Sequence, residues 1–242
     1  MNLNKSQAID PDLVFLNTVD STNRELARML EAGAHRDLLS IVAAEQSAGK
    51  GRMERSWVSE HGSSIALSVL LVPTREIEVG LVPLFVGSCV AIALRELVQT
   101  QTGVKWPNDV LIAGSKVCGV LSELTDAGVV AGIGINLRAQ IGAPDTACAV
   151  NDFVVASFDD VLSAVLAEIH ASWRLWLQHG NEFALGLIRA NSLTIGQQVR
   201  AILPDGKELV GTAEAISDDG RLQIVGSETQ LLSAADVWHL RN

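Results

Sequence analysis

Two short segments of this sequence combine residue types that could bind an anionic substrate. The first runs from position 46 to 57 and reads QSAGKGRMERSW. It holds two glycines, which can turn tightly and expose backbone N–H groups, and three cations: Gly49, Gly51, Lys50, Arg52 and Arg55. Trp57 adds an aromatic face on which a base could stack. The spacing differs from that of a Walker A loop, and a solvated surface loop with a packed tryptophan is the alternative reading.

The second segment is Lys105-Trp-Pro-Asn-Asp109, which lies between an apolar helical stretch and an apolar strand. Pro107 fixes the chain and restricts Trp106 to an extended conformation, so Lys105 is expected to point in a set direction. A lysine held in this way is a good electrostatic clamp for a carboxylate and a phosphate. The alternative is a turn with a partly buried tryptophan and an exposed lysine.

The elements around these segments form a mixed pattern of helices and strands. A helix is expected from Ser21 to Leu30, with Thr22 and Glu25 as a capping box. Strands are expected at 13–16, 41–45, 64–72 and 129–136, and a hairpin at 110–124. An apolar helix is expected at 81–98, and two further helices at 159 or 160 to 178 and at 182–190. Because helices and strands do not alternate strictly, the pattern predicts an α+β domain with a mixed sheet over residues 1–192.

After Asn191 the pattern changes to short strands punctuated by turn residues. The expected strands are 198–203, 208–216, 221–225 and 230–232, and Asp218-Asp-Gly220 marks one turn. Short strands of this kind predict a small β-barrel over residues 193–242.

Composition excludes several functional classes. The chain has 242 residues, 48% of them hydrophobic, and a net charge of −10, which opposes a general nucleic-acid coat. The three cysteines, Cys89, Cys118 and Cys148, are widely spaced, which argues against a disulfide framework and suits the cytosol. The N-terminus lacks a secretory signal, and the most apolar stretch, 80–94, is shorter than the roughly 18–20 residues of a membrane helix. We expect a cytoplasmic protein with no membrane segment.

The motifs together resemble those of a biotin–protein ligase. The matching residues run in order from about position 14 to 140: Ser21-Thr-Asn, Gln46, Gly49-Lys-Gly-Arg, Trp57, Lys105-Trp-Pro-Asn-Asp, Lys116-Val-Cys-Gly and Gly132-Ile-Gly-Ile-Asn136. The resemblance implies a mixed-sheet catalytic domain like that of class II synthetases, followed by a small SH3-like barrel. It also implies that biotin's carboxylate attacks ATP, with Mg²⁺, to give biotinyl-5′-AMP, which then modifies a lysine of a biotin carboxyl carrier protein.

The same resemblance implies roles for individual residues. Lys105 and Arg52 would be catalytic. Lys105 would bridge the carboxylate and the α-phosphate, and Arg52 would cover the carboxylate and phosphate together with Lys50 and Gly51. The biotin site would comprise Ser21, Thr22, Asn23, Gln46, Gly49, Lys50, Gly51, Arg52, Lys105, Gly132 and Gly134. The nucleotide site would comprise Arg55, Trp57, Lys116 and Asn136. No protein metal ligands are assigned, and Cys118 is expected to pack rather than to act as a nucleophile.

Two positions depart from the family's usual loop, GRGRxGRxW. Lys50 stands in place of an arginine, which keeps the charge but loses the bidentate fork. Glu54 stands in place of a glycine and adds a negative charge beside the phosphate path. We therefore expect an active enzyme with weaker ATP affinity or a leakier adenylate.

Some family members carry an N-terminal helix-turn-helix domain, but only about a dozen residues precede the first expected strand here. We therefore expect ligase activity without sequence-specific DNA binding, and leave open whether the chain is a homodimer. The alternatives are a lipoate- or octanoyl-transferring relative, a module that binds single-stranded nucleic acid, and an inactive homologue that sequesters biotin.

Overall fold

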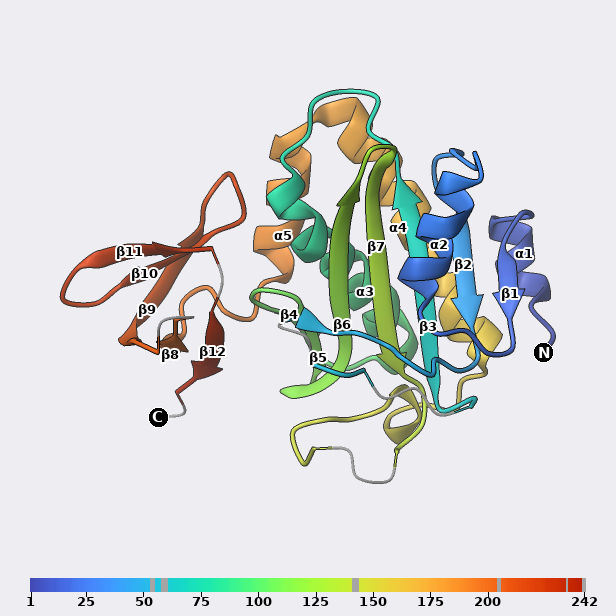
Figure 1. Ribbon diagram of the computed structural model, residues 1–242. Coiled ribbons are helices and arrows are strands. Elements are labelled where there is room, and N and C mark those ends of the chain that lie inside the picture. Colours follow the sequence, from blue (N-terminus) through green and yellow to red (C-terminus); the bar gives the residue numbers. More distant parts are fainter. Residues whose placement is uncertain (53–54, 58–60, 141–143, 204–205, 234, 241–242) are drawn as a thin grey trace.

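Two β-sheets organise the chain (Figure 1). The computed structural model describes residues 1–52, 55–57, 61–140, 144–203, 206–233 and 235–240. Its elements up to the second sheet are α1 (Asn4–Ile9), β1 (Val14–Leu16), α2 (Thr22–Glu31), β2 (Ser40–Ala43), β3 (Ser64–Leu71), η2 (Val79–Leu81), α3 (Val82–Val98), β4 (Thr102–Lys105), β5 (Asp109–Ile112), β6 (Ser115–Thr125), β7 (Gly128–Asn136), η3 (Val150–Asp152), α4 (Phe158–His179) and α5 (Asn181–Asn191).

The first sheet has seven strands in the order β1-β2-β3-β7-β6-β5-β4. It is mixed, because β1 pairs with β2 in parallel whereas the other neighbours are antiparallel. Helices α3, α4 and α5 form a layer on one face, and α2 covers part of the other face over β2, β3 and β7 (Figure 1). This arrangement confirms the predicted α+β class.

The alternation of side chains along β7 separates the core from the other face of the sheet. Ile133 and Ile135 belong to the core cluster that includes α3 and α4, whereas Gly132 and Gly134 alternate with them in sequence. Successive residues of a strand point to opposite faces, so the two glycines lie on the α2 face. The face opposite the helical layer is thereby left without bulky side chains at the centre of the sheet.

Helix α3 is apolar on nearly all sides because it lies between the sheet and two other helices. The stretch Val79–Val98 has the length and composition of a membrane-crossing helix, yet 72% of its most apolar window is buried inside the protein. Phe85 packs against Trp173 and Trp176 of α4. These contacts are those of a buried core helix, as predicted.

Several predicted element ends are wrong. The N-cap of α2 is Ser21 rather than Thr22, and the expected capping box is absent among the described contacts because Glu25 pairs with Arg28 instead. Helix α4 begins after Ser157, whose Oγ accepts the backbone N–H of Asp160, and Asp160 accepts the N–H of Ser157 in return. The sequence reading also missed α1, β4 and the last strand of the chain.

The second sheet is antiparallel and lies beside β4 and α5 (Figure 1). It contains β8 (Gln198–Ile202), β9 (Glu208–Ile216), β10 (Leu222–Val225), β11 (Thr229–Leu232) and β12 (Asp236–His239), in the order β11-β10-β9-β8-β12. Strands β11 and β12 are its two edges in the described part of the chain, so the SH3-like barrel is not confirmed. Trp106 joins it to the first sheet, because its Nε1 donates to the Gly220 carbonyl at 3.0 Å.

Candidate active site

A cavity of about 530 Å³ lies between the α2 face of the first sheet, the 46–57 loop and the start of β12. That size is within the usual range for small-molecule sites. Every predicted site residue except Gly49 lines it: Ser21, Thr22, Asn23, Gln46, Lys50, Gly51, Arg52, Arg55, Trp57, Lys105, Lys116, Gly132, Gly134 and Asn136. Segments far apart in sequence therefore meet at one site, as predicted.

Gly49 lies behind the cavity wall, where it shapes the loop. The N–H of Trp57 donates to the Gly49 carbonyl at 2.9 Å, and the N–H of Gly51 donates to the Arg55 carbonyl at 2.7 Å. A Cβ atom at Gly49 would lie 2.7 Å from the Trp57 carbonyl oxygen. Gly49 is therefore absent from the cavity lining and lets the loop fold back on itself, and its assignment to the biotin site stays a prediction.

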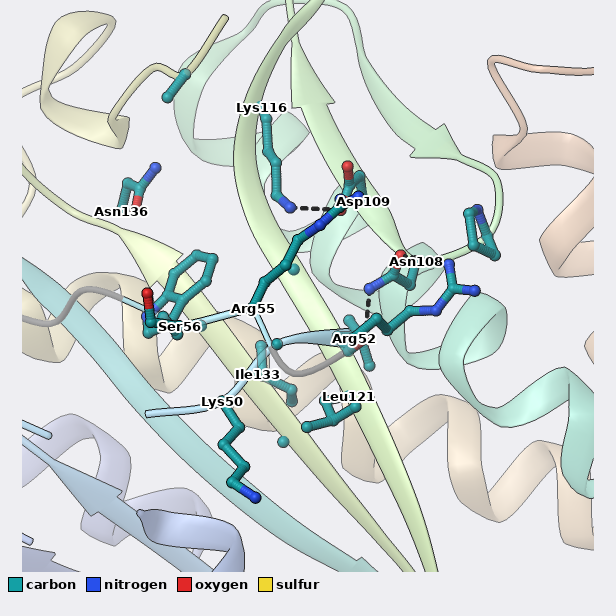
Figure 2. A pocket seen from close by; sticks show the side chains of 18 of the residues that line it. Lys50, Arg52, Arg55, Ser56, Asn108, Asp109, Lys116, Leu121, Ile133 and Asn136 are labelled. Carbon is teal, nitrogen blue, oxygen red and sulfur yellow. Dashed lines mark hydrogen bonds and ion pairs between the residues drawn. The ribbon is translucent and has the colours of Figure 1, made fainter. Parts of the chain in front are cut away.

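Lys50 is exposed at the cavity edge and extends away from Lys116 and Asp109 (Figure 2). The other departure from the family's usual loop, Glu54, lies outside the described residues. The expectation that these two positions weaken ATP binding stays a prediction.

Arg52 and Lys105, the two predicted catalytic residues, both line the cavity and are partly buried. Burial lowers the pKa of each side chain, and the nearby carboxylates of Asp109 and Asp236 oppose that shift. Nη1 of Arg52 donates to Oδ1 of Asn108 at 3.3 Å (Figure 2). Lys105 has no hydrogen-bond or ion-pair partner among the residues that the structure describes. Its ammonium is therefore available to an anionic ligand.

Two further cations of the cavity are already paired with carboxylates that the sequence reading did not assign. Nζ of Lys116 lies 2.6 Å from Oδ1 of Asp109 (Figure 2). The Arg55 guanidinium pairs with Asp236. Asp109 is the last residue of the KWPND segment, so the motif itself contained the carboxylate that pairs with Lys116. Asp236 comes from β12, a strand that was not predicted, and nothing in its sequence surroundings marks it.

The Trp57 ring lies against β6 and β7 because a glycine in each strand leaves room for it. An added Cβ at Gly134 would lie 2.3 Å from Cε2 of the Trp57 ring, and one at Gly119 would lie 3.5 Å from Cζ3. Nζ of Lys116 is 6.0 Å from the ring centroid, within the range of a cation–π contact. The buried Nε1 of Trp57 has no partner among the described residues. The ring thus provides an aromatic wall with an unused donor.

Side chains from α2 and the loop form the other end of the cavity. Oε1 of Gln46 accepts from the backbone N–H of Thr22 at 2.8 Å, so Gln46 supplies the cap that the helix lacks. Nδ2 of Asn23 donates to Oε2 of Glu123 at 2.6 Å. An added Cβ at Gly132 would lie 2.3 Å from Oδ1 of Asn23. This glycine therefore makes room for Asn23, and Glu123 is a cavity residue that the sequence reading missed.

Asn136 is fixed at the cavity wall by a backbone contact. Its Nδ2 donates to the Cys148 carbonyl at 3.0 Å, which ties the end of β7 to the following loop. Cys118 is fully buried in the core, and burial raises the pKa of its thiol. Cys118 therefore packs rather than reacts, as predicted.

The cavity is suited to chemistry between anions. It gathers lysines and arginines around one space, and such groups stabilise charge that develops on a phosphate. No group of three His, Cys, Asp or Glu side chains that could hold a metal ion occurs in the described part of the chain.

Comparison with known proteins defines the family. The model of the biotin/lipoate A/B protein ligase family matches residues 15–139, and that of the biotin protein ligase C-terminal domain matches residues 194–240. The biotin–[acetyl-CoA-carboxylase] ligase of Mycobacterium tuberculosis is 37% identical over 233 residues, which cover 91% of this chain and 86% of that protein. The chain belongs to the biotin protein ligase family. It is therefore a ligase, and biotin is the acid that the family's enzymes attach.

Other biotin protein ligases match most of this chain. The biotin–[acetyl-CoA-carboxylase] ligase of Paracoccus denitrificans is 30% identical, with 93% of this chain and 99% of that protein covered. The structure of the Aquifex aeolicus biotin protein ligase in complex with biotin and ATP matches with a TM-score of 0.78 and 28% identity, covering 95% of this chain and 99% of that one.

Proposed function

We propose that this biotin protein ligase uses the cavity to join biotin to ATP and then to a protein lysine. In the first step an oxygen of biotin's carboxylate bonds to the α-phosphorus of ATP, the bond to the β-phosphate breaks, and pyrophosphate leaves. In the second step the amine of a carrier lysine bonds to the biotinyl carbonyl carbon. AMP leaves with the bonding electron pair, and the amine loses a proton to solvent.

The observation that carries this proposal is the position of Arg52 and Lys105 in one cavity beside a glycine loop. Attacker and phosphate are both negative, so the main tasks are to screen repulsion and to align the atoms. Lys105 bridges the carboxylate and the α-phosphate, and Arg52 stabilises the charge on the phosphate oxygens. Mg²⁺ arrives with ATP as part of the substrate and helps to neutralise the pyrophosphate.

We assign the two ends of the cavity to the two substrates. The biotin ring and its tail contact the Ser21–Asn23 segment, Gln46, Lys50, Gly51 and the backbone of Gly132 and Gly134. The nucleotide contacts Arg55, Trp57, Lys116 and Asn136, with the adenine against the Trp57 ring. Asp236 of the second sheet holds Arg55 until the triphosphate takes its place.

The acceptor is the biotin carrier of a carboxylase, and we propose that it is a biotin carboxyl carrier domain. We further propose that the protein acts in the cytoplasm, that residues 1–192 and 193–242 are separate domains, and that these residues do not bind DNA in a sequence-specific way. An operator-selective gel shift at low salt would contradict the last point. The possible homodimer is tested by sedimentation with and without biotin and Mg-ATP.

The test is incubation of the protein with biotin, Mg-ATP and a biotin carboxyl carrier domain, followed by mass spectrometry of the carrier. We expect one biotin adduct on a lysine, and none when ATP or biotin is left out. Parallel reactions with lipoate and octanoate should give no adduct. A carrier that stays unmodified, or a preference for lipoate, would contradict the proposal.

A further inference from the structure

A buried hydroxyl lies behind the cavity end that α2 forms. Ser68 occupies the middle of β3, an apolar strand in which every residue is buried, and it does not line the cavity. Burying a hydroxyl costs free energy unless it is hydrogen-bonded, so an alanine or valine would suit the strand better. The hydrogen-bond partners of this hydroxyl therefore explain why a serine occupies the position.

Those partners are two side chains that line the cavity. Oγ of Ser68 lies 2.8 Å from Oγ1 of Thr22 and 2.6 Å from Oδ1 of Asn23. Ser68 pairs with Gly132 in the sheet register. Because glycine has no side chain, the Asn23 side chain can occupy the space beside it. One serine thus contacts both residues at the point where helix α2 meets the sheet.

The contacts continue on both sides into a chain of hydrogen bonds. Oγ1 of Thr22 lies 3.1 Å from Oε1 of Gln46, and Nδ2 of Asn23 donates to Oε2 of Glu123 at 2.6 Å. The chain runs from Gln46 through Thr22, Ser68 and Asn23 to Glu123. The chain ends at the amide oxygen of Gln46 and at a carboxylate oxygen of Glu123. Both oxygens accept hydrogen bonds, and neither oxygen can donate one.

Counting protons fixes the direction of this chain. Oδ1 of Asn23 is an acceptor, so the one proton of Ser68 is used there. The one proton of Thr22 then goes either to Ser68 or to Gln46, and in both cases it stays inside the network. The oxygen of Thr22 consequently faces the cavity as an acceptor, and the Asn23 amide is fixed with its NH₂ group toward Glu123.

We propose that Ser68 is a positioning residue that holds Thr22 in place as an acceptor for an N–H group of the bound substrate. The inference rests on the proposed function, because the ureido ring of biotin offers two N–H donors where a fatty or lipoyl chain offers none. Ser68 acts through Thr22 and Asn23 and does not touch the substrate. It helps to set the preference of the site for a cyclic urea.

The test compares Ser68→Ala with the matched control Ser40→Ala. Ser40 is also fully buried, in the neighbouring strand β2, but its hydroxyl donates to the Leu38 carbonyl. We expect Ser68→Ala to raise the Kd for biotin about tenfold, as for one lost hydrogen bond, while the KM for ATP at saturating biotin changes less than twofold. Ser40→Ala should leave both values unchanged.

A double-mutant cycle with Thr22→Val separates positioning from general loss of stability. If Ser68 acts through Thr22, Ser68→Ala should add less than threefold to the loss caused by Thr22→Val alone. Losses that multiply independently, or a Ser68→Ala protein with unchanged biotin affinity, would overturn the inference. If Ser68→Ala does not fold, Ser68→Cys fills the same space with a weak donor and should still lose biotin affinity. Absence of biotin binding to the unmodified protein would instead refute the proposed function.

Discussion

Replacing Gly134 by alanine should displace Trp57 and weaken ATP binding. The new Cβ would lie 2.3 Å from Cε2, 2.5 Å from Cζ2 and 2.8 Å from Nε1 of the ring, whereas ordinary contact begins at 3.4 Å. The ring must therefore move by about 1 Å, and because Trp57 is only half-buried it can do so toward the cavity. The aromatic wall that we assign to the adenine would be lost.

The size of the effect follows from the stacking that is lost. Stacking of a base on an aromatic side chain contributes about 1–3 kcal/mol, so the KM for ATP should rise roughly 5- to 150-fold. The assay is biotin-dependent exchange of pyrophosphate into ATP, with ATP varied at saturating biotin. The KM for biotin should change much less, because Asn23 and Gln46 at the other end of the cavity are not displaced.

Gly119→Ala is the matched control. Gly119 pairs directly with Gly134 across β6 and β7, and an added Cβ there would be 3.4 Å from Nζ of Lys116 and 3.5 Å from the Trp57 ring. These are ordinary contacts, so this variant should keep a KM for ATP within about threefold of the unmodified protein. Equal effects of the two alanines, or no effect of Gly134→Ala in a protein with unchanged Tm, would refute the reasoning.

Three further outcomes are expected from the charged groups. Asp236→Asn frees Arg55 to bind phosphate. Because exposed ion pairs contribute up to about 1 kcal/mol, the KM for ATP should fall by up to roughly fivefold. A raised KM for ATP in steady-state assays would contradict this. Burial lowers the pKa of His170 below its ordinary 6.5, so the free energy of unfolding should fall as pH drops below 6.5, and urea denaturation of His170→Gln should show less of this dependence. Lys105→Met should lower the kcat of pyrophosphate exchange about 10²- to 10³-fold. The loss in Lys116→Met should be smaller, because Asp109 already neutralises Lys116. A larger loss for Lys116→Met would assign the bridging role to that residue.

Motifs with their own local chemistry were predicted well from the sequence. The family resemblance carried by the KWPND segment and the glycine loop predicted a shared cavity, although each segment alone also fits a turn or a surface loop. The hairpin between β5 and β6 and the long helices followed from turn residues and apolar periodicity. These signals are local, and the structure preserves them.

The missed features depend on contacts between distant segments. The cap of α2 comes from Gln46, which is 24 positions away from Thr22, so no local capping rule could find it. Gly132 and Gly134 are predicted to make backbone contacts to biotin, but that prediction does not reveal that the space beside their Cα atoms holds Asn23 and Trp57. Asp236 reaches the cavity through the packing of the second sheet on the first, which sequence periodicity does not encode.

The central claim is that Lys105 and Arg52 together permit an acid to attack a triphosphate in this cavity. The most direct measurement is formation of biotinyl-5′-AMP from biotin and Mg-ATP without any acceptor protein, followed in a single turnover by release of pyrophosphate. The account predicts one adenylate per protein for the unmodified enzyme and a rate reduced at least 100-fold in Lys105→Met and in Arg52→Met. Adenylate formation at an unchanged rate in either folded variant would contradict it.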